Sequence, residues 1–302
     1  MKMKIVIFLI VLLVLVVIGF RFYNSFKTKP NIKASYIRLI IPLSDFNTFD
    51  PDIFVKEYMN NWQTKLVCVE TNDLKKDNNN QRIYLLGNGK HNLMIKINNC
   101  PLNKEFTDIL IDASKNGFTA NESITNEEAF ALSSHKANLE LEYVFGSEEK
   151  IDRAICTSQL IVSIFKHFKA IGLVNVSAQS YIPANKLTHI LQKQDLLLTD
   201  IFDLFVNTQT VKSDNVTEVH THGMEQFYLP DMILHSKNNL DVSYNSSILK
   251  NACVYNIENN NILKVGDGFQ LTGYKETFLI EKAVPEKEHP FGAFGAVGIR
   301  EK

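Results

Sequence analysis

An apolar run at the N-terminus constrains this chain more than any other feature of its sequence. Residues 5–20 carry no charged or polar side chain, and Lys4 and Arg21 flank them. A helix over this run is about 24 Å long at ~1.5 Å per residue, which is close to the ~30 Å hydrocarbon core of a bilayer. Basic side chains at both ends reach the interfaces. The run therefore predicts a transmembrane helix within an anchor over residues 1–21.

A cleaved signal peptide is the alternative interpretation of this segment. Cleavage needs small residues just after the apolar run, whereas this run ends in Gly19-Phe20-Arg21-Phe22. The sequence therefore favours an uncleaved, single-pass membrane anchor. Basic residues are nearly balanced on the two flanks, so the positive-inside rule leaves the side of the membrane open.

The remaining sequence predicts a short linker and one globular domain. Residues 22–34 are basic, contain Pro30 and lack periodicity, which is typical of a juxtamembrane linker. Residues 35–302 show neither a fixed repeat nor a break in composition. The 302 residues include 32 basic and 33 acidic side chains, and this balance argues against a nucleic-acid partner.

Strand-like and helix-like segments are interspersed along residues 35–302, without a strict alternation of the two. We therefore expect an α+β domain with one mixed or antiparallel sheet and helices packed on it. The expected strands cover residues 36–43, 66–69, 82–86, 92–97, 139–145, 173–179, 216–221, 232–235, 269–271 and 277–280. The expected helices cover residues 50–62, 103–114, 127–134, 148–170, 185–204 and 246–257.

The four cysteines exclude the common zinc and redox motifs, because no two of them form a C-x-x-C pair. They are Cys68, Cys100, Cys156 and Cys253. Their even number allows two disulfides, but four buried thiols are the interpretation that we favour.

His220 and His222 are the residues most suggestive of chemistry. Residues two apart on a strand point to the same side, so the two imidazoles can face one metal ion. Such a site needs a third ligand from elsewhere. His135 or Asp231 would complete a metal-dependent hydrolase, and His235 and Glu225 are further ligands of a suitable type.

No other motif predicts an active site or a cofactor. The sequence lacks a Gly-x-Ser-x-Gly nucleophile elbow, and Cys156 has apolar helical neighbours. Glycines recur over residues 291–298, but no helix can follow them as a dinucleotide-binding loop requires. We therefore expect no nucleotide and no cofactor, and we interpret these glycines as permitting a tight crossing of the chain.

Two segments resemble a bacterial family known only as a domain of unknown function. One is Ser-His-Lys-Ala at residues 134–137, and the other is Thr-His-Gly-Met at 221–224 followed by Leu-Pro-Asp at 229–231. Tyr228 stands where the family has glycine, Asp231 stands where glutamate is commoner, and His220 lies outside the pattern. The motif residues carried over are His135, Thr221, His222, Gly223, Met224, Pro230 and Asp231.

Together these observations predict a non-enzymatic, membrane-tethered bacterial module that binds a protein partner. The resemblance adds an immunity-type role as one version, by analogy alone. The alternative is the metal-dependent hydrolase that uses His220 and His222.

Overall fold

The computed structural model describes residues 37–45, 49–71, 81–115, 123–147, 149–212, 216–237, 242–259, 263–271, 273, 275–284 and 291–301. Residues Ser35–Lys302 form one compact unit. The predicted anchor over residues 1–21, its apolar run 5–20 and the linker over 22–34 lie outside the described residues. Among the helices that are described, none is long and apolar enough to cross a membrane.

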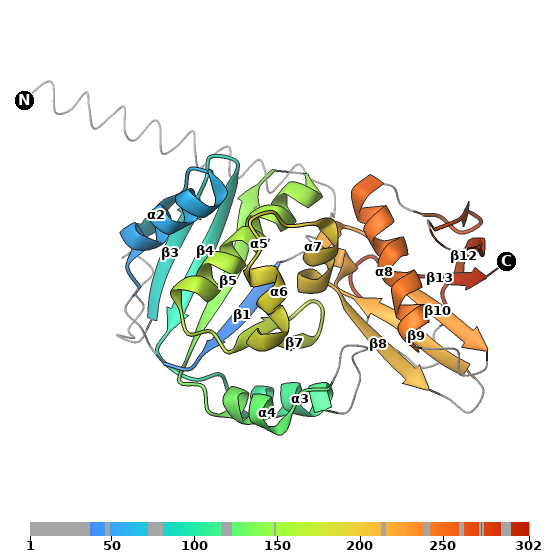
Figure 1. Cartoon of the computed structure of the whole chain (residues 1–302), viewed down its shortest axis with the longest axis horizontal. Coiled ribbons are helices and arrows are strands. Elements are labelled where there is room, and N and C mark those ends of the chain that lie inside the picture. Colours follow the sequence, from blue (N-terminus) through green and yellow to red (C-terminus); the bar gives the residue numbers. More distant parts are fainter. Residues whose placement is uncertain are drawn as a thin grey trace, which may run out of the picture. The chain divides into compact units, whose positions relative to one another are not determined.

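The expectation of a single sheet is wrong, because the described residues form two sheets. The helix expected before that sheet falls on residues outside the described part of the chain. Sheet A is antiparallel throughout, with strand order β2-β3-β4-β5-β1-β6-β7 (Figure 1). Its strands are β1 (Arg38–Leu43), β2 (Val67–Glu70), β3 (Gln81–Gly87), β4 (His91–Asn98), β5 (Ala137–Gly146), β6 (Gly172–Asn175) and β7 (Ser180–Pro183).

Sheet B follows later in the chain, with strand order β11-β12-β13-β10-β9-β8. Within it β10 and β13 run parallel, and the other neighbours are antiparallel. Its strands are β8 (Asn207–Lys212), β9 (Val216–His222), β10 (Asp231–Lys237), β11 (Gly268–Phe269), β12 (Phe278–Lys282) and β13 (Ala296–Glu301). Local patterns predict strands but not their partners, which is why one sheet was expected.

Local signals place the helices well. Asp50 caps α2, because its side chain accepts hydrogen bonds from the backbone N–H groups of Asp52 and Ile53, and Pro51 follows at the first helical position. The helices are α2 (Pro51–Trp62), α3 (Lys104–Lys115), α4 (Asn126–Ser133), α5 (Lys150–His167), α6 (Thr188–Leu191), α7 (Leu198–Phe205) and α8 (Val242–Asn259), with short 3-10 turns η1 (Ala184–Leu187) and η2 (Met224–Phe227).

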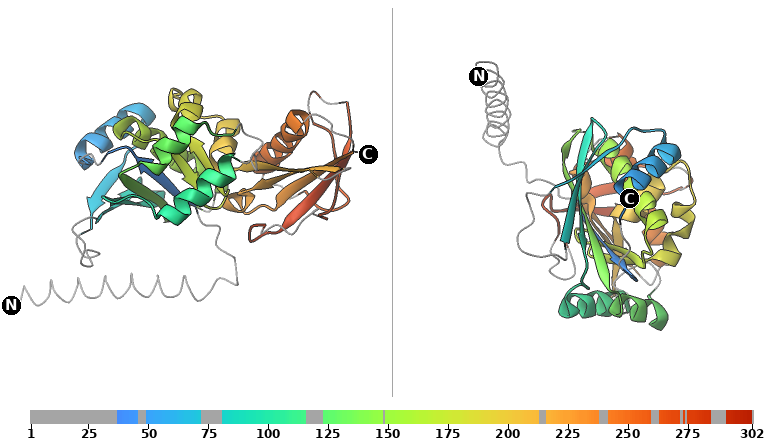
Figure 2. Two further views of the ribbon diagram at one scale, coloured as in Figure 1. Left: turned by 90° about the horizontal axis from the view of Figure 1, so that it is seen from below. Right: turned by 90° about the vertical axis from the view of Figure 1, so that its left-hand side faces the viewer.

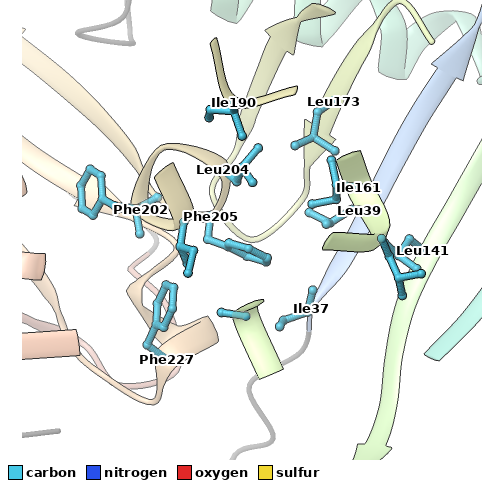
Figure 3. Packing of buried hydrophobic residues seen from close by; sticks show 14 of the residues in the cluster. Ile37, Leu39, Leu141, Ile161, Leu173, Ile190, Phe202, Leu204, Phe205 and Phe227 are labelled. Carbon is cyan, nitrogen blue, oxygen red and sulfur yellow. The ribbon is translucent and has the colours of Figure 1, made fainter. Parts of the chain in front are cut away.

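One hydrophobic core joins the two sheets. It extends from sheet A, through α5 and α7, to sheet B and the α8 helix that packs on it. Figure 3 shows Phe205 of α7 between Leu39 of sheet A and Phe227 of the η2 turn, with Phe202 of the same helix on the side away from Leu39. The two sheets therefore share their buried apolar surface and belong to one domain.

The opposite face of sheet A is only partly covered. α3 and α4 pack on it through Leu110 and Leu132, against Ile40, Val174 and Tyr181 of the β1, β6 and β7 strands. Figure 2 shows these two helices apart from α2 and α5. The cluster that α3 and α4 form on this face includes no residue of β2 or β3. On β3, Leu85 is 44% exposed on this face, whereas Ile83 is buried.

All four cysteines are free thiols. Cys156 and Cys253 are buried as expected, but Cys68 is half-buried and Cys100 is exposed. The expectation that all four are buried is therefore wrong for two of them.

Candidate functional site

The β9 strand carries a row of buried titratable side chains on one face. Glu218, His220 and His222 alternate along it, and their side chains have relative exposures of 0%, 0% and 2%. Val219 lies on the other face, within the core that also contains α8 residues. Strand alternation thus places the two histidines on the same side, as the sequence predicts.

The carboxylate of Glu218 lies between two imidazoles. Its Oε1 is 2.8 Å from Nδ1 of His220, and its Oε2 is 3.3 Å from Nε2 of His235. His235 reaches this position because it stands opposite Glu218 in the β9–β10 ladder. Glu218 was not among the predicted site residues, although the alternation Glu218-x-His220-x-His222 was a usable signal for it.

An aromatic ring from the glycine-rich tail packs on the two histidines. The rings of His220 and His222 are 5.0 Å apart between centroids, and Phe291 stacks on His222 at 5.9 Å. Phe291 also meets His220 edge-on at 6.0 Å. The tail is therefore part of the packing around this cluster.

The metal-site hypothesis finds little support in this geometry. In the described part of the chain, no three His, Cys, Asp or Glu side chains come together as a metal site. His135, one proposed third ligand, precedes β5 of sheet A instead. Its Nε2 accepts a hydrogen bond from Leu102 N at 2.6 Å, and its Nδ1 lies 2.6 Å from Leu132 O. Both ring nitrogens therefore contact backbone groups.

Asp231, the other proposed ligand, accepts hydrogen bonds that stabilise a turn. Its Oδ1 accepts hydrogen bonds from Met224 N at 3.2 Å and from the Thr221 hydroxyl at 3.3 Å, and its Oδ2 accepts one from Gly292 N at 3.4 Å. Burial raises the pKa of Asp231 to about 7, against the opposing effect of these hydrogen bonds. The neighbouring Glu225 accepts a bond from Ala293 N, so both carboxyl groups hold residues 292 and 293 against the turn.

Gly223 lets the same turn approach the end of α7. It has φ of +106°, and a Cβ there would lie 2.3 Å from Phe205 O. The Gln226 side chain donates to that carbonyl at 2.8 Å. Only glycine fits both the left-handed backbone and this close approach.

Arg153 of α5 binds the far side of the turn. Its guanidinium donates to Gln226 O at 2.7 Å and to the Tyr228 hydroxyl at 2.6 Å, and it lies over the Tyr228 ring at 4.4 Å. The motif from Thr221 to Asp231, which includes Met224 and Pro230, thus forms a buried connection between the α5 and α7 helices and sheet B. Its contacts are those of a structural element.

An exposed apolar patch lies elsewhere, at the β2–β3 end of sheet A. Val69 and Leu85 stand opposite each other in the β2–β3 ladder, and Val67 is two residues from Val69 on the same face. Their exposures are 50% for Val67, 54% for Val69 and 44% for Leu85. We call these three residues the β2–β3 patch.

Ion pairs border the patch on the same face. Arg38 binds Glu140 at 2.9 Å and Lys96 binds Glu142 at 3.1 Å. These two cations and two anions pair with one another, so the border carries no net charge. The apolar side chains are therefore what this surface offers to another molecule.

Comparison of the chain with protein-family models, with curated proteins and with solved structures finds no match. The resemblance to the family of unknown function stays a prediction. The function must therefore be argued from the sites of this chain alone.

Proposed function

We propose that the protein is a non-enzymatic interaction module whose β2–β3 patch binds the apolar surface of a partner protein. The observation that carries this proposal is the side-by-side exposure of Val67, Val69 and Leu85 on one face of the sheet. Clustered apolar surface of this kind marks interaction sites, whereas single exposed apolar residues are ordinary. The charged side chains beside the patch pair with one another, which favours a partner whose contacting surface is also apolar.

The buried histidine cluster is less suited to be the working surface. Glu218 and His220 have no solvent-exposed surface, and Phe291 packs against the neighbouring His222. A hydrolase must admit its substrate to the reacting groups. The β2–β3 patch is accessible without any rearrangement.

Site-specific photo-crosslinking in the native host tests this proposal. A photoreactive phenylalanine at Val69 should give one discrete adduct with a partner protein, because that side chain lies in the contact. The same residue at Val265, which is 63% exposed but outside the patch, is the matched control. Leu85→Glu should abolish the adduct from position 69 while the far-ultraviolet circular dichroism stays unchanged. Equal adducts from both positions, or an adduct that survives Leu85→Glu, would refute the proposal.

We also propose that the protein is attached to a bacterial membrane through the apolar residues 5–20. Their unbroken apolar character supports this localisation. The full chain should then stay with the membrane fraction after an alkaline carbonate wash, and a variant lacking residues 1–34 should be released. Release of the full chain by the wash would contradict the proposal.

A further inference from the structure

A second surface feature is a cavity of about 620 Å³ beside the C-terminal end of α2. It is lined by the end of that helix, by one face of α5 and by the segment 194–196. Its volume lies within the range of small-molecule sites, about 300–1,000 Å³. The cavity lies on the side of sheet A that α2 and α5 cover, whereas the β2–β3 patch lies on the other face.

Carboxamide groups dominate the lining. Each carboxamide offers two N–H donors and one carbonyl acceptor and carries no charge. Asp195 brings the single charge of the described lining, and neither lysine nor arginine occurs there. The carboxamides belong to Asn60, Asn61, Gln63, Gln159 and Gln194.

This lining selects a neutral ligand that is rich in hydroxyl groups. An anionic ligand would find no cation among the described lining residues, and it would meet the Asp195 carboxylate. A purely apolar ligand would displace water from these carboxamides and offer no hydrogen bonds in return, which is costly. Hydroxyl groups both donate and accept, so they match carboxamides in either orientation.

Trp62 supplies an aromatic surface next to these polar groups. Its indole is half-buried, and its Nε1 donates to the Ser163 hydroxyl at 3.0 Å. That bond holds the ring in one orientation at the cavity. Sugar rings combine hydroxyl groups at their edge with C–H groups on their faces, and aromatic side chains pack on such faces.

Two of the carboxamides are already held in place. The Tyr58 hydroxyl donates to Oε1 of Gln159 at 3.0 Å. Gln63 ends α2 with a left-handed backbone, φ of +53°, and its Nε2 donates to Asn60 O at 2.9 Å. A non-glycine residue in this conformation costs free energy, and a pre-ordered group loses less entropy when a ligand binds.

We propose that this cavity binds a neutral saccharide, with Trp62 packing on a sugar face and the surrounding carboxamides binding its hydroxyl groups. Saccharide binding at this cavity does not depend on the partner contact proposed for the β2–β3 patch. A variant that loses one activity should keep the other.

Intrinsic fluorescence offers a direct test, because Trp62 is the only tryptophan of the chain. The purified full chain is titrated with neutral disaccharides, namely cellobiose, maltose and N,N′-diacetylchitobiose, and with glucuronic acid as the anionic comparison. We expect a saturable change in emission with at least one neutral disaccharide and none with glucuronic acid.

Gln194→Leu tests the assignment to this cavity, because Gln194 is exposed and the substitution leaves the core intact. Loss of its hydrogen bonds should weaken binding about tenfold. Gln270→Leu, a carboxamide outside the cavity, is the matched control and should bind like the natural chain. A chain that gives no saturable response to any neutral disaccharide overturns the proposal. So do equal affinities for the natural chain and Gln194→Leu, or a response to an unrelated peptide but to no saccharide.

Discussion

The carboxylate of Glu218 lies 2.8 Å from Nδ1 of His220, and neither side chain has any solvent-exposed surface. The same carboxylate reaches His235 on the next strand. Removing a buried polar group takes a contact away from the polar atoms packed against it, and that costs free energy. The stability of sheet B should therefore depend on this group.

Glu218→Ala should lower the free energy of unfolding by about 1–3 kcal/mol, measured by urea denaturation followed by circular dichroism. Glu281→Ala is the control, because Glu281 pairs with Arg300 at the surface. That exposed pair should contribute no more than about 1 kcal/mol. Similar losses for the two variants would contradict the importance of burial.

Asp231 should make stability depend on pH. Burial raises its pKa from 3.8 to about 7 in the folded protein, so the folded state binds more protons than the unfolded state between those values. Stability contributed at this site therefore falls as pH rises from about 4 to about 7 and stays low above that. Asp231→Asn, which cannot ionise, should remove this component. Unfolding free energies of both proteins across this window should diverge, and a constant difference would contradict the raised pKa.

Gly223 should tolerate no side chain. Gly223→Ala brings a Cβ to 2.3 Å from Phe205 O at φ of +106°, so both strain and overlap destabilise the fold. Gly266→Ala has a similar φ of +97° but meets nothing within 4 Å, and it isolates the backbone strain. The Gly223 variant should be less stable than the Gly266 variant by at least about 2 kcal/mol. Equal melting temperatures for the Gly223 and Gly266 variants would show that the turn can move away from Phe205 O at little cost.

Thiol reactivity should single out Cys100, which is exposed. Burial raises the pKa of Cys68 and of Cys156 to about 12, and it also raises that of the buried Cys253. Thiolate is the reactive form. Iodoacetamide at neutral pH should therefore label one thiol quickly, counted by intact mass, and Cys100→Ser should remove that label. Fast labelling of no thiol in the natural chain would point to disulfides instead.

Local elements follow closely from the sequence. Asp50-Pro51 sets the start of α2, and a turn over residues 88–90 separates β3 from β4. Helical periodicity also finds α5. Yet the apolar Ile53 of α2 is 49% exposed, because the side of a helix that becomes buried depends on what the helix packs against.

The strands that the sequence analysis missed are those with weak local patterns. The β7 strand has four residues, and β8 is rich in polar side chains. The β13 strand begins at Ala296 within the glycine-rich tail, where it runs parallel to β10. Its pairing joins residues about 65 positions apart, a separation over which local spacing carries no information.

The candidate sites divide in the same way. Strand alternation was enough to place His220 and His222 on one side, but the approach of His235 to Glu218 depends on the β9–β10 register. The roles of His135 and Asp231 were decided by the backbone groups that surround them. The β2–β3 patch and the carboxamide-lined cavity could likewise not be predicted from the sequence, because the exposure of a side chain depends on how the distant segments of the chain pack.

The sequence by itself determined the apolar N-terminal run, the order of most helices and strands, and the faces of the clearest ones. These follow from hydrophobic periodicity and from capping and turn residues, which act over a few neighbouring positions. Only the tertiary structure decided that the strands form two sheets and that the Thr221–Asp231 motif joins sheet B to α5 and α7. Strand pairing and burial depend on contacts between distant segments, and the free energy of those contacts cannot be deduced from any one segment alone.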